Sequence, residues 1–359
     1  MSTAIAERTT TPARSKNPAV DVRALRHQRK LRSRLVIPVL AVALVLAIGI
    51  RVLLGSYSVT IPDFFSILMG HTIPGAGGAR FIVLQEKLPH AVLGALAGLA
   101  FGCAGAIFQL LLRNPLASPD IIGINASSSL GAVAALAFFG ASSTGMAVGG
   151  LLGAVACAVV IFGLSVGRDG LVGNRFVLIG LGVAVLAIAL ANYLLSRINI
   201  YQAADAAIWL TGSLGSANWS RITMLAVVLL ILLPLSAILT RNLHAMEVGD
   251  ELARGLGVPV AATRWVYIGL AVVMVAFAVA VTGPITFVAF VSGPIARKLI
   301  GGRHSLVASA LIGAIIVVLA DFAAAELIPG GRLPVGVVTG VVGAPILLWL
   351  VASANKERS

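Results

Sequence analysis

Apolar residues gather in ten stretches along the chain, separated by short polar or charged turns. Most of these stretches approach the roughly 20 residues that an α-helix needs to cross the hydrocarbon core of a bilayer. One is short and bracketed by Gly283, Pro284, Gly293 and Pro294, which predicts a partial or tilted helix inside a bundle. The pattern therefore predicts an all-α polytopic membrane protein of about ten spans, near residues 35–54, 91–112, 120–139, 145–166, 176–196, 222–240, 265–282, 284–296, 306–323 and 333–352.

The second stretch carries three glycines at regular spacing. Gly94, Gly98 and Gly102 recur every four residues, which places them on one face of a helix. Small residues at this spacing let a neighbouring helix approach closely in lipid. We therefore expect this face to be a helix-packing surface.

A polar break follows the end of this helix. Lipid tolerates such a break only where it is buried in protein or faces water, so it is a candidate part of a translocation path. The residues concerned are Gln109, Asn114, Pro115 and Asn125, with Arg113, Ser118, Pro119 and Gly123 between them.

The composition agrees with a membrane protein, because 59% of the residues are apolar and only 11% are charged. The net charge is +13, but the basic residues are spread over many loops, which argues against nucleic-acid binding. Cys103 and Cys157 both fall within predicted spans, where a free buried thiol behaves as a small hydrophobe. Two such cysteines form no disulfide framework or metal-binding pattern.

The sequence holds no motif for nucleotide binding or catalysis. There is no GxxxxGK[ST] loop to cradle phosphates, so any ATP must be hydrolysed by another subunit. The five histidines fall in predicted tails, loops or helix ends and form no nucleophilic or metal-binding set. We therefore expect a non-enzymatic chain that binds no cofactor directly.

Positive residues of membrane proteins concentrate in cytoplasmic loops. With ten spans and both ends in the cytoplasm, all but six of the 26 Lys and Arg lie on that side, the six being Arg51, Arg80, Lys87, Arg197, Arg221 and Arg332. We expect residues 1–34 to form a basic, disordered cytoplasmic tail that sets the topology and can also touch anionic lipid. Residues 35–353 then form the transmembrane domain, and residues 354–359 form a second cytoplasmic tail.

The longest connection after the N-terminal tail, residues 243–264, joins the sixth and seventh spans. A short helix is predicted there, with an acidic first turn that suits the helix dipole and a glycine and proline at its end. Its apolar face is formed by Met246, Leu252, Ala253 and Leu256, its acidic turn by Glu247, Asp250 and Glu251, and its end by Gly257 and Pro259. The spacing alone favours a loop helix that lies at the membrane interface.

Long segments of the chain resemble the bacterial binding-protein-dependent permeases for ferric siderophores, haem and vitamin B12. The segments run from Gly94 to Ala132, from Ala207 to Trp219, from Gly283 to His304 and from Asp321 to Pro345. The resemblance thus extends over nearly the whole chain outside the N-terminal tail. It implies the type II fold of permease subunits of ATP-binding-cassette importers.

In this family the connection between the sixth and seventh spans is the coupling element that docks in a groove of the ATPase. Gly249, Ala253, Leu256 and Gly257 match the family's G, A and LG positions. The resemblance therefore implies a role in ATPase coupling for these residues and for their neighbours Glu247 and Leu252.

A second implied contact lies on the outer side of the membrane. The segment KLPH, Lys87 to His90, stands where the family commonly has Arg-Leu-Pro-Arg, and positive charges there would suit carboxylates of a substrate-delivering protein. A third family arginine corresponds to Ala325, and Arg332 stands where the family often has Glu. Lys87, His90 and Arg332 are therefore docking candidates, while Lys87 suits a snorkelling anchor at the membrane surface equally well.

Two further positions bear on partners and on ion coupling. Gly293-Pro294 stands where the family often has Pro-His, and with the altered arginines this resembles permeases that pair with a non-identical sister chain, as in ferric-enterobactin uptake. We therefore expect a heterodimer.

Asp321, near the end of the ninth span, is a candidate functional acid, but its place close to the interface favours capping or pairing with Arg332.

These features together predict one transmembrane half of an ATP-driven importer for a ferric siderophore in the bacterial cytoplasmic membrane. The implied partners are a sister permease, an ATPase pair that binds ATP and Mg, and an extracytoplasmic binding lipoprotein. Haem or cobalamin stays an alternative substrate, because the siderophore assignment rests on analogy. The rival class is an ion-coupled secondary transporter, which often places ionisable residues near the bilayer middle, where these spans lack acids.

Overall fold

The computed structural model describes residues 18–71, 78–120, 122–167, 170–171, 173–327 and 333–356. Most of the described residues are helical. The elements are α1 (Pro18–Leu53), α2 (Ile61–Leu68), α3 (Ala79–Phe81), η1 (Ile82–Lys87), α4 (Leu88–Leu111), α5 (Ile124–Phe139), α6 (Ser143–Ser165), a two-stranded antiparallel pair β1 (Val166–Gly167) and β2 (Gly170–Leu171), α7 (Gly173–Leu195), α8 (Ile200–Leu210), α9 (Trp219–Ile238), α10 (Thr240–Ala245), η2 (Met246–Val248), α11 (Asp250–Gly255), α12 (Val260–Thr282), α13 (Val288–Ile300), α14 (Leu306–Phe322), η3 (Ala323–Leu327) and α15 (Val335–Lys356).

Each of the ten apolar stretches coincides with a helix, so the all-α polytopic prediction is confirmed. Among the described residues, seven helices are long and apolar enough to cross a membrane, and α5 and α15 are shorter apolar helices. The second of these seven runs without interruption from Ala79 to Leu111, because α3, η1 and α4 are continuous. It therefore begins well before the expected residue 91.

The first helix also begins earlier than expected. α1 starts at Pro18, so residues 18–34 of the expected disordered tail are helical and continue the first span. Residues 1–17 and 357–359 lie outside the described residues.

The expected partial helix is α13, which has 13 residues. Gly283, at φ 71°, ends α12, and residues 283–287 are not helical before α13 begins after Phe287, at φ 66°. Nearby non-helical backbone is paired within the protein: the amide of Ser213 donates to the carbonyl oxygen of Thr282 at 2.7 Å. Irregular backbone at membrane depth is stable only when protein satisfies its polar groups in this way.

The centre of the molecule is α4, which is buried along most of its length and packs along α14. The glycine face predicted from the sequence is this contact. A side chain added at Gly98 would collide with the backbone of Gly313 and Ala314, and one added at Gly102 would collide with the backbone of Ser309. The approach is reciprocal, because a side chain at Gly313 would collide with the carbonyl oxygen of Gly98. We call this contact the α4–α14 seam.

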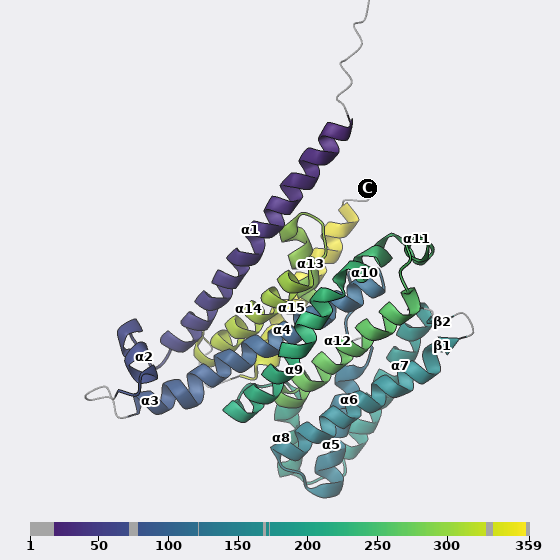
Figure 1. The fold of residues 1–359 in the computed structure, drawn as a ribbon. Helices are drawn as coiled ribbons and strands as arrows, with labels where there is room; N and C mark the ends of the chain where they lie inside the picture. Colours follow the sequence, from purple (N-terminus) through teal and green to yellow (C-terminus); the bar gives the residue numbers. More distant parts are fainter. Residues whose placement is uncertain are drawn as a thin grey trace, which may run out of the picture.

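The helices run roughly along one direction, and the two ends of the bundle differ (Figure 1). The start of α1 and the end of α15 lie at the same end as α10 and α11. The short helices α2, α3 and α8 lie toward the opposite end. We call these the α11 end and the α8 end.

Candidate functional site

The connection between α9 and α12 forms three short helical turns at the α11 end. Met246 and Ala253 are buried, while Val248, Leu252 and Leu256 are 60%, 63% and 71% exposed. The single apolar face predicted for this connection is therefore wrong: the first two residues anchor the connection to the body of the protein, and the other three present apolar surface outward. Exposed apolar side chains in such a cluster are typical of a protein-docking surface.

Two glycines flank α11. Gly249 has φ 122° and Gly257 has φ 79°, and a side chain at either position would meet open space. Positive φ is readily adopted only by glycine, so the backbone conformation, and not a close contact, requires glycine here. Glycine at these two positions lets the chain turn sharply into and out of α11.

Asp250, the first residue of α11, lies between two arginines. One carboxylate oxygen accepts from the Arg113 guanidinium, and the other accepts from Arg264 Nη2 at 2.8 Å. Arg113 also donates from Nε to the carbonyl oxygen of Met246 at 3.1 Å. Burial opposes ionisation of Asp250, but the hydrogen bond from Arg264 and the charges of Arg264, Arg113 and Arg254 outweigh it, so the pKa of Asp250 is lowered.

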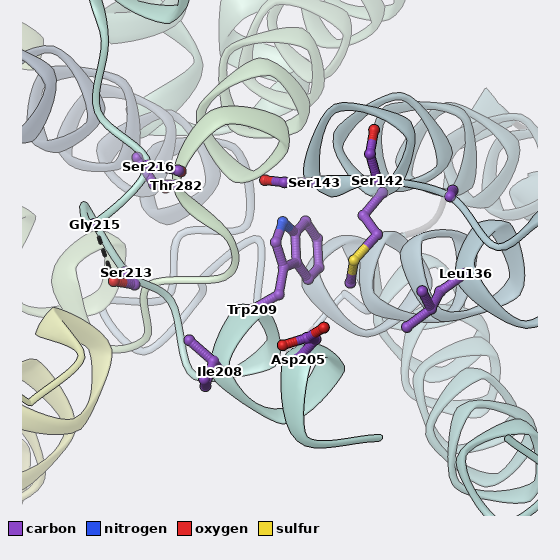
Figure 2. A pocket seen from close by; sticks show the side chains of 12 residues that line it. Leu136, Ser142, Ser143, Asp205, Ile208, Trp209, Ser213, Gly215, Ser216 and Thr282 are labelled. Carbon is purple, nitrogen blue, oxygen red and sulfur yellow. Dashed lines mark hydrogen bonds between the residues drawn. The ribbon is translucent and has the colours of Figure 1, made fainter. Parts of the chain in front are cut away.

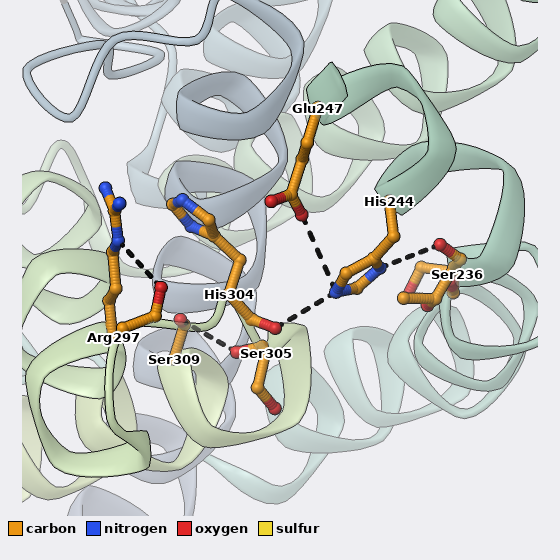
Figure 3. A network of polar contacts seen from close by, with 9 residues as sticks. Ser236, His244, Glu247, Arg297, His304, Ser305 and Ser309 are labelled. Atoms are coloured by element: carbon orange, nitrogen blue, oxygen red, sulfur yellow. Dashed lines mark hydrogen bonds and ion pairs between the residues drawn. The ribbon is translucent and has the colours of Figure 1, made fainter. Parts of the chain in front are cut away.

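A second polar network joins the same connection to the turn between α13 and α14 (Figure 3). The His244 ring contacts the carbonyl oxygens of Thr240 at 2.9 Å and of His304 at 3.0 Å, and Glu247 lies 3.8 Å from its Nε2. Glu247, expected to be an ATPase-coupling residue, thus faces this network in the structure. Burial, with the positive charge of Arg297 and the nearby His244, lowers the pKa of His304 to about 4.

The polar break predicted after α4 divides into two groups. Asn114 and Pro115 are exposed at the α11 end, close to Arg113. Gln109 and Asn125 are buried, and Gln109 Nε2 donates to the carbonyl oxygen of Phe290 at 3.0 Å. None of these four lines either of the two cavities described below.

Asn125 is hydrogen-bonded to Asp120, which was not among the site residues predicted from the sequence. Asn125 Nδ2 donates to Asp120 Oδ1 at 2.6 Å, and the amide of Asp120 donates to Ser118 Oγ at 3.2 Å. The backbone of Phe287, which precedes α13, also hydrogen bonds to Asp120. Asp120 therefore joins the turn after α4 to the broken helix.

At the α8 end, Lys87 is buried and only 3% exposed. Its ammonium donates to the carbonyl oxygens of Leu54 and Tyr57 at 2.7 and 2.6 Å. Both expectations for Lys87, a docking charge and a membrane-surface anchor, require an exposed ammonium and disagree with this position. His90 is also buried, with its Nδ1 2.7 Å from the carbonyl oxygen of Glu86, and Arg332 lies outside the described residues.

Asp321 pairs with a partner other than the one expected. Its Oδ2 accepts from Arg51 Nε at 2.5 Å, and the two side chains are 9% and 1% exposed. Arg332 lies outside the described residues, so the expected pairing with it stays a prediction. The two residues are 270 positions apart, and only the packing of α1 against α14 brings them together.

Two cavities flank α8. The first, of about 530 Å³, lies between the α5–α6 turn, α8 and the end of α12. The Trp209 ring and the Asp205 carboxylate project from α8 there, with Ser143 opposite (Figure 2). Met146 also lines this cavity. The second, of about 490 Å³, is lined by the Arg51–Asp321 pair and His90, and Ile208 lines both.

Comparison with known proteins identifies the family. The model of the FecCD transport family matches residues 41–353. The ferric enterobactin transport system permease protein FepG of Escherichia coli K12 is 33% identical over 305 residues, covering 85% of this chain and 91% of that protein. The Fe(3+)-citrate import system permease protein YfmE of Bacillus subtilis 168 is 35% identical over 335 residues, covering 92% of this chain and 98% of that protein.

Two further relatives agree. The Fe(3+) dicitrate transport system permease protein FecD of Escherichia coli K12 is 38% identical over 283 residues, covering 77% of this chain and 87% of that protein. A solved metal-chelate type ABC transporter in an inward-facing conformation has a TM-score of 0.78 and 26% identity, covering 88% of this chain and 98% of that chain. With a transport-family match over most of its length and an all-helical bundle that agrees with it, this chain belongs to the FecCD transport family.

Proposed function

We propose that this chain is a transmembrane subunit of an ATP-dependent importer that carries a ferric siderophore into a bacterial cell. The observation that carries the proposal is the agreement of its relatives, whose names specify permeases for ferric enterobactin and ferric citrate. Haem and cobalamin are the alternative cargoes of the family. A large chelate is held in a permease through diffuse contacts, so the delivery protein sets most of the selectivity.

The α11 end is the cytoplasmic end in this proposal. Both α1 and α15 reach it, and the tails and loops expected there carry most of the Lys and Arg residues, as cytoplasmic segments do. The α8 end then faces the outside. The two cavities beside α8 lie where a delivered substrate would first meet the chain.

The ATPase partner docks on the connection at the α11 end. Val248, Leu252 and Leu256 give it an apolar surface, and the buried Met246 and Ala253 tie that surface to the body of the permease. A second permease chain, an ATPase pair that binds ATP and Mg, and an outer binding protein complete the importer. We propose a non-identical sister for the second chain because of the altered docking arginines and the Gly293-Pro294 departure.

In this mechanism, closure of the ATPase pair on ATP moves the connection, and the two permease chains open alternately to the two sides. This chain contributes the packed central helix α4 and the exposed surface of the connection between α9 and α12, on which the ATPase acts. The rival mechanism, ion-coupled transport, needs an acid free to exchange ions within the bilayer. The acid that was the candidate for that role, Asp321, is engaged by Arg51 at 2.5 Å.

The test is uptake by proteoliposomes that hold the full complex. Labelled ferric enterobactin, ferric citrate, haem and cobalamin are offered, each with its delivery protein, and the ATPase is used as wild type and as a hydrolysis-deficient variant. We expect uptake of one ferric siderophore that stops with the inactive ATPase and persists when ion gradients are collapsed. Uptake that survives ATPase inactivation and stops without an ion gradient would establish the rival mechanism. Uptake of only haem or cobalamin would show that the cargo is not a ferric siderophore.

A further inference from the structure

Arg113 has an unusual backbone conformation. It follows α4 and has φ 48°, one of two non-glycine residues with positive φ in the described part of the chain. Glycine is the usual residue where a helix ends in this conformation, because a side chain there is strained. Arginine at this position therefore indicates that its side chain has a role that compensates for the strain.

That side chain reaches the connection between α9 and α12. It donates to the carbonyl oxygen of the buried Met246 at 3.1 Å and contacts the carboxylate of Asp250. Arg264, in the second turn of α12, holds the other oxygen of the same carboxylate at 2.8 Å. Asp250 thus connects α11 at once to the end of α4 and to the start of α12.

These two helices belong to the buried centre of the molecule. α4 is locked against α14 at the seam, and α4 and α12 are the most deeply buried of the membrane-spanning helices. α11 itself is a short helix between two positive-φ glycines, at which a side chain would meet open space. Its backbone links are sharp turns, so its position relative to the core depends on the buried Ala253 and on the ion pairs of Asp250.

We propose that Asp250, clasped by Arg113 and Arg264, is the positioning group that transmits movement of α11 to α4 and α12. This rests on the proposed function, in which the ATPase moves α11. The clasp is partly exposed, with Arg113 44% and Asp250 27% exposed, and such pairs add little to folding stability. Its loss therefore uncouples ATP hydrolysis from transport while the permease stays folded.

The decisive variant is Arg113→Gly. Glycine suits φ 48° without strain, so the variant keeps the turn and removes the Arg113 contacts with Asp250 and with the carbonyl oxygen of Met246. In the reconstituted complex we expect an unchanged or higher thermal midpoint, normal ATPase binding, and a ratio of substrate transported to ATP hydrolysed that falls at least about tenfold, equivalent to about 1.4 kcal/mol. Asp250→Asn, which keeps the shape but not the charge, should lower the same ratio.

The matched control is Arg241→Gln, which removes a basic side chain of α10 that is exposed at the same end. We expect this variant to keep the wild-type ratio of substrate transported to ATP hydrolysed. A lower ratio would show that loss of any positive charge at this end reduces coupling, and it would overturn the proposal. A wild-type ratio for Arg113→Gly would also overturn the proposal, even where the wild-type complex transports with ATP as proposed above. Absence of ATP-dependent transport in the wild-type complex would instead overturn the proposed function.

Discussion

The α4–α14 seam and the connection around α11 use glycine for opposite purposes. At the seam, Gly98 and Gly313 allow two backbones to touch, and any side chain would collide with main-chain atoms. Around α11, a side chain at Gly249 or Gly257 would meet open space, and only the positive φ requires glycine there. The same residue type thus builds a close helix–helix contact at the seam and the turns around α11, and only the neighbouring atoms distinguish the two uses.

The largest effect is expected from a larger residue at the seam. Gly98→Leu should prevent normal folding or cost more than about 3 kcal/mol, because backbone atoms cannot move aside as side chains do. Membrane yield and the thermal midpoint of the purified chain measure the effect. Leu99→Phe is the control, since Leu99 is only partly buried, and equal yield and stability for the two variants would refute the seam.

The next effect concerns the buried pair at the α8 end. Arg51→Met alone should destabilise the chain by about 3 to 5 kcal/mol, because it leaves the Asp321 carboxylate buried without its cation. Adding Asp321→Leu should recover much of that loss, since an apolar pair needs no partner charge. Thermal unfolding of the two single variants and the double variant forms a mutant cycle, and additive losses would contradict the coupling.

A smaller loss of stability but a clear loss of assembly is expected at the outward face of α11. Leu252→Asp should abolish co-purification of the ATPase and ATP-dependent uptake while the thermal midpoint stays near that of wild type, because Leu252 is 63% exposed. Ala253→Arg should also stop transport, but through misfolding, since Ala253 is fully buried. If the Leu252→Asp variant still binds the ATPase, the outward face of α11 is not the docking surface.

The smallest effect is a pH dependence at the α11 end. The pKa of His304 is lowered to about 4 in the folded chain, while an unfolded histidine titrates near about 6.5. Between these values only the unfolded state takes up the proton, so stability present above pH 6.5 is lost as the pH falls toward 4. His304→Gln should flatten this part of the stability curve measured by thermal unfolding, and an unchanged slope would show that other groups cause it.

Several features were predictable because they depend on local pattern. The spacing of Gly94, Gly98 and Gly102 identified a packing face, and the glycines and prolines around residues 283–294 indicated a short helix. The connection at 243–264 was found from its length and charge. The burial of Lys87 was not predictable, because a sequence shows that a lysine is charged but not that two carbonyl oxygens accept hydrogen bonds from it inside the protein.

Hydrophobic length and glycine spacing act within one helix, so they were enough to predict a helical membrane protein. The FecCD type was implied only by the resemblance that the motifs carry. Only the tertiary structure decided which charges meet. Arg51 and Asp321 are 270 positions apart, and Arg113 and Asp250 are 137 positions apart. The sequence does not show which of the acidic residues along the chain pairs with each arginine. Ion pairs form where helix ends arrive in space, and that arrangement depends on the packing of the whole bundle.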